Sequence, residues 1–436
     1  MDSSKANDSS FVNTKSPLSW KFLSMYKGEA NIAHDKSAVI PDFLDQHNQW
    51  SEQNLVKNPK VLLLLNELDW FWSHRLPLAK AILDRNWHLS LTTHDTSNDP
   101  RLTEIGIDGY DIPRMNRPLN PLSQIRFMWS LYRVFKETKP DIIHSITLRY
   151  AFYAGIVARL MGYKPVISTI AGLGSLYSTS TLKMRVIRAI ATPFLKFAFG
   201  GSGKFVIFQN PDNMNSMLQS GTVAQNQAHL IRGSGVDLNE FPHIPYEENG
   251  DIPTITFASR LLREKGILDF IEAAKYLKNQ GFKANFIVAG NLIPGNKRFI
   301  SAMEIEQPNS DGIVEWRGKV TDMPKLMQES MIVVLPSYYE EGIPKVLLEA
   351  AATGRPIISC DVPGCREIVN HDVNGLLMPP KNPMLLARAI EELVTNELKR
   401  QAYGRASREL VESDFNSDYV LEQTMEVYRK ATSQIE

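Results

Sequence analysis

The sequence predicts an α/β protein with two successive Rossmann-like parallel-sheet domains. From residue 60 onward, short apolar runs typical of buried parallel strands alternate with stretches typical of helices. The alternation stops in the polar, proline-rich segment 243–253 and then starts again. We therefore predict four parts: a polar N-terminal extension over 1–57, an N-terminal domain over 58–245, a C-terminal domain over 246–410, and a C-terminal helix over 411–436 that packs back on the N-terminal domain.

The elements of the first domain follow from this pattern. A loop running into a helix is expected over 69–86, and further helices around 122–137 and over 150–162. The following apolar runs indicate strands: 60–66, 87–93, 141–145, 165–171, 204–210 and the start of 229–241.

The second domain repeats the alternation. Helices are expected over 266–280, 323–329 and from Pro344 to Thr353, where proline suits the first helical position and Gly354 supplies a left-handed residue after the last turn. The strands are expected at 254–260, 284–290, 313–318, 331–337 and 355–360.

Composition is that of an ordinary soluble globular protein. Hydrophobic residues make up 43% and charged residues 22%, and 48 basic side chains balance 48 acidic ones, which argues against nucleic-acid binding. No apolar run approaches the roughly 18 to 20 residues that a membrane span needs, and the start lacks the apolar core of a secretion signal. We expect a cytoplasmic protein. Cys360 and Cys365 lack the company of zinc ligands, so we interpret them as reduced thiols.

Charged residues gather where two strands of the second domain should end. Arg260 ends the strand at 254–260 and Lys265 lies in the loop after it, and two cations at a strand end suit a diphosphate. Glu341 precedes the helix at Pro344, and Glu349 lies eight residues further along the chain. With the N–H groups of the helix start between them, the two carboxylates would suit a nucleotide sugar. The alternatives are that Glu341 only caps the helix and that Glu349 and the two cations are solvated.

Two stretches of the first domain also lie where strands should end, namely Asn66 to His74 and His144 to Arg149. His144 is interpreted either as a group facing a ligand crevice or as a hydrogen-bonded core histidine. His74 is interpreted more simply, as a residue at a helix start.

Residues 181–204 combine an apolar stripe with basic side chains, among them Arg185 and Arg188. Such a helix suits an anionic membrane surface, but it equally suits a core-facing helix with a solvated basic side. The sequence GGSGKF at 200–205 is not a phosphate-binding loop, because Phe205 replaces the required Ser or Thr.

Several runs carry a family resemblance. In the second half they are SRLLREKGILDFIEA (259–273), WRGKVTDMPKLM (316–327), LPSYYEEGIPKVLLEAAATGRPIISCDVPGCREIV (335–369) and NGLLMPP (374–380). They resemble the nucleotide-sugar-binding domain of the family-4 retaining glycosyltransferases of the GT-B fold, in which two Rossmann-like domains face a central cleft. The first half resembles, more loosely, the acceptor domain of polysaccharide-assembling members through NELDWFWSHRLPLAKAI, DIIHSITLRYAFYAGIVARL, ISTIAGLG and VIFQN. The glycine-rich loop that many members carry after the first strand has no counterpart at Asn66 to Phe71.

The resemblance implies roles for individual residues. Arg260 and Lys265 would bind the diphosphate, and Glu349 the ribose hydroxyls. Glu341 would contact the donor sugar, with the N–H groups around Gly342 and Ile343 assisting the phosphate. His144 would face the sugar from the other domain, so Glu341 and His144 are the catalytic candidates. Candidates on the acceptor side are Asn66, His74, Arg149 and Gly172.

The activity implied is transfer of a hexose or N-acetylhexosamine from a UDP-sugar to a polyprenyl-diphosphate-linked saccharide, for capsule, exopolysaccharide or O-antigen. No cofactor or metal is expected beyond the UDP-sugar co-substrate, because the sequence contains no D-x-D motif. A peripheral position on the inner face of the plasma membrane and contact with anionic lipid are further expectations. The alternatives are a nucleotide-sugar 2-epimerase of the same fold and a non-catalytic sugar-nucleotide-binding protein.

Overall fold

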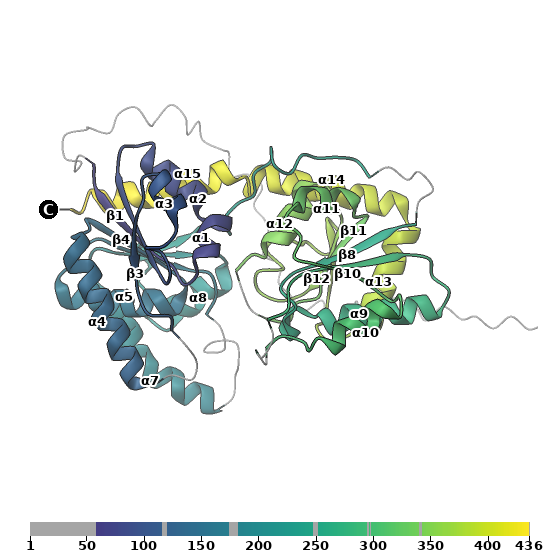
Figure 1. Cartoon of the computed structure of the whole chain (residues 1–436), viewed down its shortest axis with the longest axis horizontal. Coiled ribbons are helices and arrows are strands. Elements are labelled where there is room, and N and C mark those ends of the chain that lie inside the picture. Colours follow the sequence, from purple (N-terminus) through teal and green to yellow (C-terminus); the bar gives the residue numbers. More distant parts are fainter. Residues whose placement is uncertain are drawn as a thin grey trace, which may run out of the picture. The chain divides into compact units, whose positions relative to one another are not determined.

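The computed structural model describes residues 58–115, 120–173, 182–246, 252–293, 296, 298–339 and 342–435, without the side chain of Lys183. All of them fall within one compact unit, Leu55–Glu436. The predicted extension over 1–57 and the predicted site residue Glu341 lie outside the described residues. Two sheets with helices on both faces organise the unit, which confirms the predicted α/β class (Figure 1).

The first sheet has seven strands in the order β3-β2-β1-β4-β5-β6-β7, and each neighbouring pair is parallel. Its central strands are buried along nearly their whole length, as expected for a parallel sheet covered on both faces. The strands are β1 (Lys60–Leu64), β2 (His88–Thr93), β3 (Asp108–Asp111), β4 (Ile142–Ile146), β5 (Val166–Ile170), β6 (Lys204–Phe208) and β7 (Ala228–Leu230).

Helices connect these strands. Those of the first domain are α1 (Leu68–His74), α2 (Leu76–Leu83), α3 (Pro100–Glu104), α4 (Pro121–Thr138), α5 (Leu148–Met161), α7 (Leu182–Phe199), α8 (Pro211–Gln219) and the short 3-10 helix η3 (Gln225–Gln227). Asparagine begins several helices: the side chain of Asn120 accepts a hydrogen bond from the N–H of Leu122 at the start of α4, and Asn210 caps α8 in the same manner.

The second sheet has six parallel strands in the order β10-β9-β8-β11-β12-β13. They are β8 (Thr254–Ala258), β9 (Asn285–Ala289), β10 (Glu315–Gly318), β11 (Ile332–Leu335), β12 (Ile357–Cys360) and β13 (Gly375–Met378). The helices are η4 (Arg263–Lys265), α9 (Ile267–Asn279), α10 (Met303–Ser310), α11 (Met323–Glu329), α12 (Lys345–Ala352), α13 (Pro383–Thr395), α14 (Glu397–Asp414) and α15 (Ser417–Thr432).

The last helix, α15, belongs to the core of the first sheet. It packs against α2 and β5, and buries Val420, Met425 and Tyr428 in the same cluster as the β1 side chains. The chain therefore returns to its first domain after completing the second.

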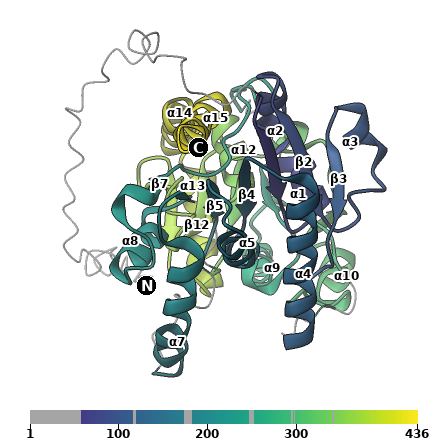
Figure 2. The ribbon, with the colours of Figure 1, turned by 90° about the vertical axis from the view of Figure 1, so that its left-hand side faces the viewer.

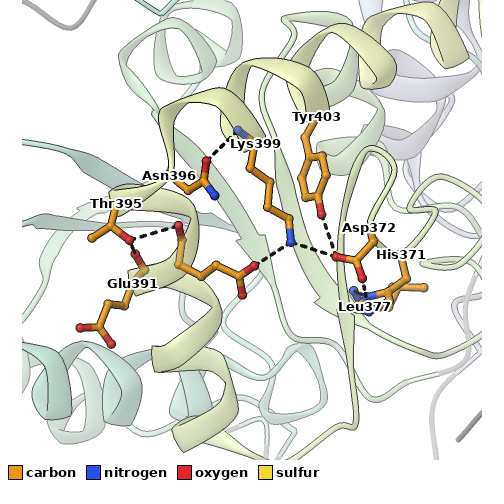
Figure 3. Close-up of polar contacts among 9 residues, drawn as sticks. His371, Asp372, Leu377, Glu391, Thr395, Asn396, Lys399 and Tyr403 are labelled. Atoms are coloured by element: carbon orange, nitrogen blue, oxygen red, sulfur yellow. Dashed lines mark hydrogen bonds and ion pairs between the residues drawn. The ribbon is translucent and has the colours of Figure 1, made fainter. Parts of the chain in front are cut away.

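A polar network holds the preceding helix, α14, to the second sheet (Figure 3). Lys399 Nζ lies 3.0 Å from Asp372 Oδ1 and 2.6 Å from Glu392 Oε1. Tyr403 donates its hydroxyl to the same Asp372 oxygen at 2.9 Å. These contacts join α13, α14 and the loop before β13, and the Lys399 and Tyr403 partners hold the pKa of Asp372 below its usual value despite partial burial.

Three local predictions differ from the structure. The stretch 69–86 forms two helices rather than one, and His74 ends α1 instead of starting a helix. Pro344 is the residue before α12 and not its first helical residue. The edge strand β3 was missed by the sequence pattern, because Asp108–Asp111 reads DGYD and has no apolar alternation.

Candidate functional site

Each sheet has one place where its strand order changes direction. In the first sheet the chain runs outward from β1 to β3 on one side and from β4 to β7 on the other. In the second sheet it runs from β8 to β10 and from β11 to β13. Ligands of open α/β sheets bind outside the carboxyl ends of the strands at such switch points. The loops after β1 and β4, and those after β8 and β11, are therefore the first places to look for a site.

The two predicted cations lie at the switch point of the second sheet. Arg260 follows β8 by two residues and is exposed, whereas Lys265 ends η4 and is buried. Gly266, directly after Lys265, has a left-handed backbone (φ +77°), and a Cβ atom there would collide with the carbonyl oxygen of Pro336. The N–H of Tyr338 also donates to Glu264 O at 3.0 Å. These two contacts hold the turn formed by residues 264–266 against the loop that follows β11.

Glu349 reaches the same switch point from α12, the helix that follows β11. Its side chain is only 6% exposed, so the alternative of a solvated carboxylate is wrong. Burial raises the pKa of Glu349, and the Lys345 cation, with its Nζ 3.6 Å from Glu349 Oε1, opposes that shift. A buried carboxylate whose ion pair with Lys345 is this long can still accept hydrogen bonds from ligand hydroxyls.

The loop before α12 contacts the first domain closely. A Cβ atom at Gly342 would lie 2.9 Å from Ala171 O and would collide with the side-chain oxygen of Gln209. Ile343 is buried, and it lies next to Gly233. A side chain at position 342 would therefore have to displace Gln209 and shift the loop away from Ala171.

Lys345 was not predicted as a site residue, yet it joins the two domains. Its Nζ donates to the carbonyl oxygen of Ser73, at the end of α1, at 3.1 Å. Because it also lies near Glu349, it places α1 beside the buried carboxylate. The only signal in the sequence was its position four residues before Glu349, which puts both on one helix face.

His74 lies in this electropositive environment. Its ring stacks on Trp70, with centroids 4.9 Å apart, and its Nδ1 lies 2.6 Å from Ser73 Oγ. Burial, together with the nearby cations Lys345, Arg75 and Arg260, lowers the pKa of His74 to about 3. His74 is therefore neutral at physiological pH, and the Lys345, Arg75 and Arg260 cations lie near enough to oppose its protonation.

Asn66, the acceptor-side candidate after β1, carries a buried Oδ1 atom with no hydrogen-bond partner among the described residues. An unpaired buried acceptor is costly and points to a donor that is absent here. Arg149 lies in the first turn of α5, with its guanidinium 3.4 Å from Met115 O. Gly172 follows β5 by two residues and is half-buried. Asn66, Arg149 and Gly172 thus lie after β1, β4 and β5, which are neighbouring strands of the first sheet.

His144 is placed differently from its predicted role. It is 1% exposed, its Nδ1 lies 2.7 Å from the Tyr428 hydroxyl, and its Nε2 lies 2.8 Å from Thr169 Oγ1. Burial lowers the pKa of His144 to about 3, so the ring is neutral and both nitrogens are occupied by α15 and β5. The structure favours the core-histidine interpretation over the prediction that His144 faces the donor sugar, because no ring nitrogen is left to reach a ligand.

Two family models match the parts of the chain that carry these residues. "Glycosyl transferase 4-like" matches residues 60–210, and "Glycosyl transferases group 1" matches residues 240–410. Both halves of the chain thus match glycosyltransferase models, and the chain is a glycosyltransferase.

Particular relatives extend this finding. The chain is 28% identical to a Campylobacter jejuni N,N'-diacetylbacillosaminyl-diphospho-undecaprenol alpha-1,3-N-acetylgalactosaminyltransferase, over 78% of this chain and 91% of the relative. It is 24% identical to an Escherichia coli UDP-Gal:alpha-D-GlcNAc-diphosphoundecaprenol alpha-1,3-galactosyltransferase, over 62% and 71% of the two chains.

Solved structures show the same fold. A glycosyltransferase from Rickettsia africae is similar with a TM-score of 0.67 at 17% identity, over 87% of this chain and all of that one. HepE from Anabaena, solved in complex with UDP, is similar with a TM-score of 0.67 at 19% identity, over 85% of this chain and 100% of that one. These likenesses confirm the predicted GT-B architecture of two Rossmann-like domains.

Proposed function

We propose that this glycosyltransferase transfers a hexose or N-acetylhexosamine from a UDP-sugar to a polyprenyl-diphosphate-linked saccharide, with retention of anomeric configuration and without a metal ion. The product extends a surface polysaccharide such as a capsule, exopolysaccharide or O-antigen. The enzyme works in the cytoplasm, peripherally attached to the inner face of the plasma membrane.

The observation that carries this proposal is the set of Arg260, Lys265 and Glu349 around the β8/β11 switch point. Departure of a nucleoside diphosphate from an anomeric carbon builds negative charge on the leaving phosphate. Arg260 and the buried Lys265 supply positive charge there, and Glu349 supplies an acceptor for the ribose hydroxyls. Two fixed cations can replace a metal in this role, and the absence of a D-x-D motif from the sequence agrees with that mechanism.

The names of the relatives support the choice of donor and acceptor. Both quoted curated relatives are named for transfer to a diphospho-undecaprenol saccharide, and one of them is named for UDP-galactose. A capsular polysaccharide glycosyltransferase of Staphylococcus aureus is 23% identical over 86% of this chain and 97% of that relative. These names support a UDP-sugar donor, a lipid-linked acceptor and a polysaccharide product.

Retention is proposed to occur by attack on the same face from which the diphosphate leaves, with a leaving phosphate oxygen taking the proton of the acceptor hydroxyl. A double displacement would need a carboxylate opposite the leaving group, and the sequence offers no identified candidate for it. Glu341 is the residue proposed nearest to the transferred sugar.

The test combines binding and product analysis. UDP-sugars are screened for protection of the full chain against thermal unfolding, and the protective sugar is then incubated with a diphospho-polyprenol saccharide in the presence of EDTA. The proposal expects a product with the anomeric configuration of the donor, as read by NMR. Conversion of the UDP-sugar alone to its 2-epimer, without transfer, would instead establish the epimerase.

A further inference from the structure

Two features of the first domain lie outside the donor site. One is the apolar stripe of α7, whose exposure makes the core-facing interpretation of that helix wrong and fits the peripheral attachment already proposed. The exposed members of the stripe are Leu182, Val186, Ile190, Phe194 and Phe197. The other feature is a pair of buried polar atoms without partners, in the connection between β1 and α2.

Arg75 contributes the first of these atoms. It lies between α1 and α2, and its buried Nε atom has no hydrogen-bond partner among the described residues. Within the same part of the chain, its guanidinium forms no ion pair. Burial lowers the pKa of Arg75 to about 10, so the side chain is still charged at physiological pH. A buried cation without a counter-charge is costly, and a ligand that brings an anion would remove that cost.

Asn66 contributes the second atom, the buried Oδ1 that lacks a donor. Strand β1 ends at Leu64, so Asn66 and Arg75 both belong to the connection that follows β1 at the switch point of the first sheet. Within this connection α1 packs against α2 (Figure 2). An acceptor that lacks a donor and a cation that lacks an anion fit a ligand carrying both hydroxyl and phosphate groups, such as a saccharide diphosphate.

The neighbouring loop, after β4, is strained at the same level of the sheet. β1 and β4 are paired with Leu64 opposite Ser145, and Asn66 and Thr147 follow these partners by two residues each. Thr147 has φ +78° and ψ +140°, a backbone conformation that β-branched residues rarely adopt. Strain of this kind is found mostly at functional sites, which agrees with a ligand at the β1/β4 switch point.

The end of α1, where Arg75 lies, is in contact with the second domain. Ser73, two residues before Arg75, accepts a hydrogen bond from Lys345 Nζ at 3.1 Å. His74 lies between Ser73 and Arg75, and the charges of Lys345, Arg75 and Arg260 all act on its ring. A ligand held by Arg75 would therefore lie on the side of the first domain that meets the donor domain.

The two substrates of the proposed reaction each carry a diphosphate. Arg260 and Lys265, from the second sheet, are assigned to the diphosphate of the donor in the proposed function. Arg75 comes from the first sheet, in the same connection as the unpaired Asn66. A second diphosphate bound here would belong to the acceptor, in which it is attached directly to a saccharide whose hydroxyls can reach Asn66.

We infer that Arg75 binds a substrate diphosphate, that of the lipid-linked acceptor, and that Asn66 accepts a hydrogen bond from a hydroxyl of the acceptor saccharide. The planar guanidinium donates to phosphate oxygens, a geometry that arginine offers and lysine does not. The inference rests on the proposed function for the identity of the acceptor. The donor is the other source of a diphosphate, and the experiment separates the two.

Geranyl diphosphate, a prenyl diphosphate without a sugar, is the probe for the anion. Calorimetry measures its affinity for the full chain in saturating UDP, which occupies the donor diphosphate site. Arg75→Met should weaken binding about tenfold or more, because a charged hydrogen-bond donor is lost. Arg75→Lys should weaken it by a smaller factor, because the charge remains without the planar fork. Lys80→Met, which removes an exposed cation from α2, is the matched control and should bind as wild type.

Kinetics separate a binding role from a structural one. With a diphospho-polyprenol saccharide, Arg75→Met should raise the acceptor KM about tenfold or more. With the same saccharide on an uncharged alkyl group, Arg75→Met and wild type should have the same KM. Asn66→Ala should raise the KM about fivefold for both acceptors, since both carry the saccharide hydroxyls. The affinity for UDP should be unchanged in Arg75→Met.

Three outcomes overturn the inference. They are unchanged affinity of Arg75→Met for geranyl diphosphate, weakened UDP affinity, which would assign the guanidinium to the donor, and an equal rise in KM with charged and uncharged acceptors, which would make Arg75 structural. If Arg75→Met does not fold, Arg75→Lys is held to the same three outcomes. If geranyl diphosphate binds through Arg75 but no sugar is transferred to a diphospho-polyprenol saccharide, the proposed function fails while this anion site stands.

Discussion

At the scale of single residues, the candidate donor site depends on a buried carboxylate and the cations around it. Glu349 is buried beside Lys345, and Lys345 in turn holds the carbonyl of Ser73. A buried carboxylate left without a cation would favour its protonated form, which accepts hydrogen bonds less well. Lys345 is therefore a candidate positioning residue: its charge opposes the rise in the pKa of Glu349, and its hydrogen bond to Ser73 O holds the end of α1 nearby.

Lys265→Ala should weaken UDP binding by about tenfold or more, because a hydrogen bond to a charged group contributes roughly 1.5 to 3 kcal/mol. Isothermal titration calorimetry measures the change. Lys275→Ala, which removes an exposed lysine from α9, is the matched control and should bind UDP as wild type does. Unchanged UDP affinity in Lys265→Ala would refute the assignment of this lysine to the diphosphate.

Glu341→Ala tests the residue proposed nearest to the donor sugar. It should lower kcat much more than it changes the affinity for UDP, since UDP lacks the sugar that Glu341 is proposed to contact. Glu349→Ala should show the opposite pattern in calorimetry, with weakened UDP binding. If both variants lose UDP affinity equally, the two glutamates do not have separate roles.

Lys345→Met should shift the pH dependence of UDP affinity. Burial already raises the pKa of Glu349, and loss of the Lys345 cation raises it further. As pH falls, the ionised form of Glu349, which we propose accepts hydrogen bonds from the ribose hydroxyls, is therefore lost at a higher pH in the variant than in the wild type. Lys345→Arg keeps the charge and should retain the wild-type profile. Coincident profiles for Lys345→Met and wild type would contradict the positioning role.

At the scale of elements, the site is built by tight turns between strands and helices. The turn at Gly266 connects η4 to α9 and touches Pro336, so it sets the position of Lys265 against the loop after β11. Similarly, the contact of Gly342 with Gln209 and Ala171 sets the loop before α12 against the first domain.

Gly266→Ala should lower the free energy of unfolding more than Gly281→Ala does. Both glycines are left-handed, with φ of +77° and +78°, so both variants incur the strain of about 1 kcal/mol expected for a side chain there. Only Gly266 adds a collision with Pro336 O, whereas Gly281 has open space. Urea denaturation compares the two, and calorimetry should show weaker UDP binding in Gly266→Ala alone. Equal losses of stability would mean that the turn can move away from Pro336.

At the scale of the whole molecule, the C-terminal helix α15 links the two domains. It follows the last helix of the second domain and packs into the core of the first. Its Tyr428 hydroxyl binds His144, which is itself fixed by Thr169. The interior of the first domain thus contains a neutral histidine, His144, and one of its two hydrogen bonds is supplied by the C-terminal helix.

Stability should fall as pH drops below about 6.5, because His144 and His74 have folded-state pKa values of about 3. In the unfolded chain each takes up a proton near its ordinary pKa, so between pH 6.5 and 3 the unfolded state binds more protons. The stability associated with the two neutral histidines is fully present above pH 6.5, and it is lost progressively as the pH falls from 6.5 to 3. At pH 5 the loss is about 2 kcal/mol for each histidine. Urea unfolding at pH 8 and pH 5 measures it, and a His74→Gln variant should lose less stability than wild type over the same interval.

Most strands and the residues at their ends could be predicted from the sequence because they depend on local patterns. Apolar runs predicted β1, β4 and β8 to within two residues at their starts, and the placement of Arg260 and Lys265 after β8 followed directly. β3 was missed because a short polar edge strand has no such pattern. Lys345 was missed because its partner Ser73 lies far away in the sequence.

The sequence by itself determined the α/β class, the two-domain order, and the identity of the candidate cations and of Glu349, since periodicity and spacing are properties of neighbouring residues. Only the tertiary structure decided that β8 lies beside β11, that His144 is enclosed by α15, and that the α7 stripe faces outward. Each of these depends on contacts between elements distant in the chain, and local preferences carry no information about which distant element completes a core.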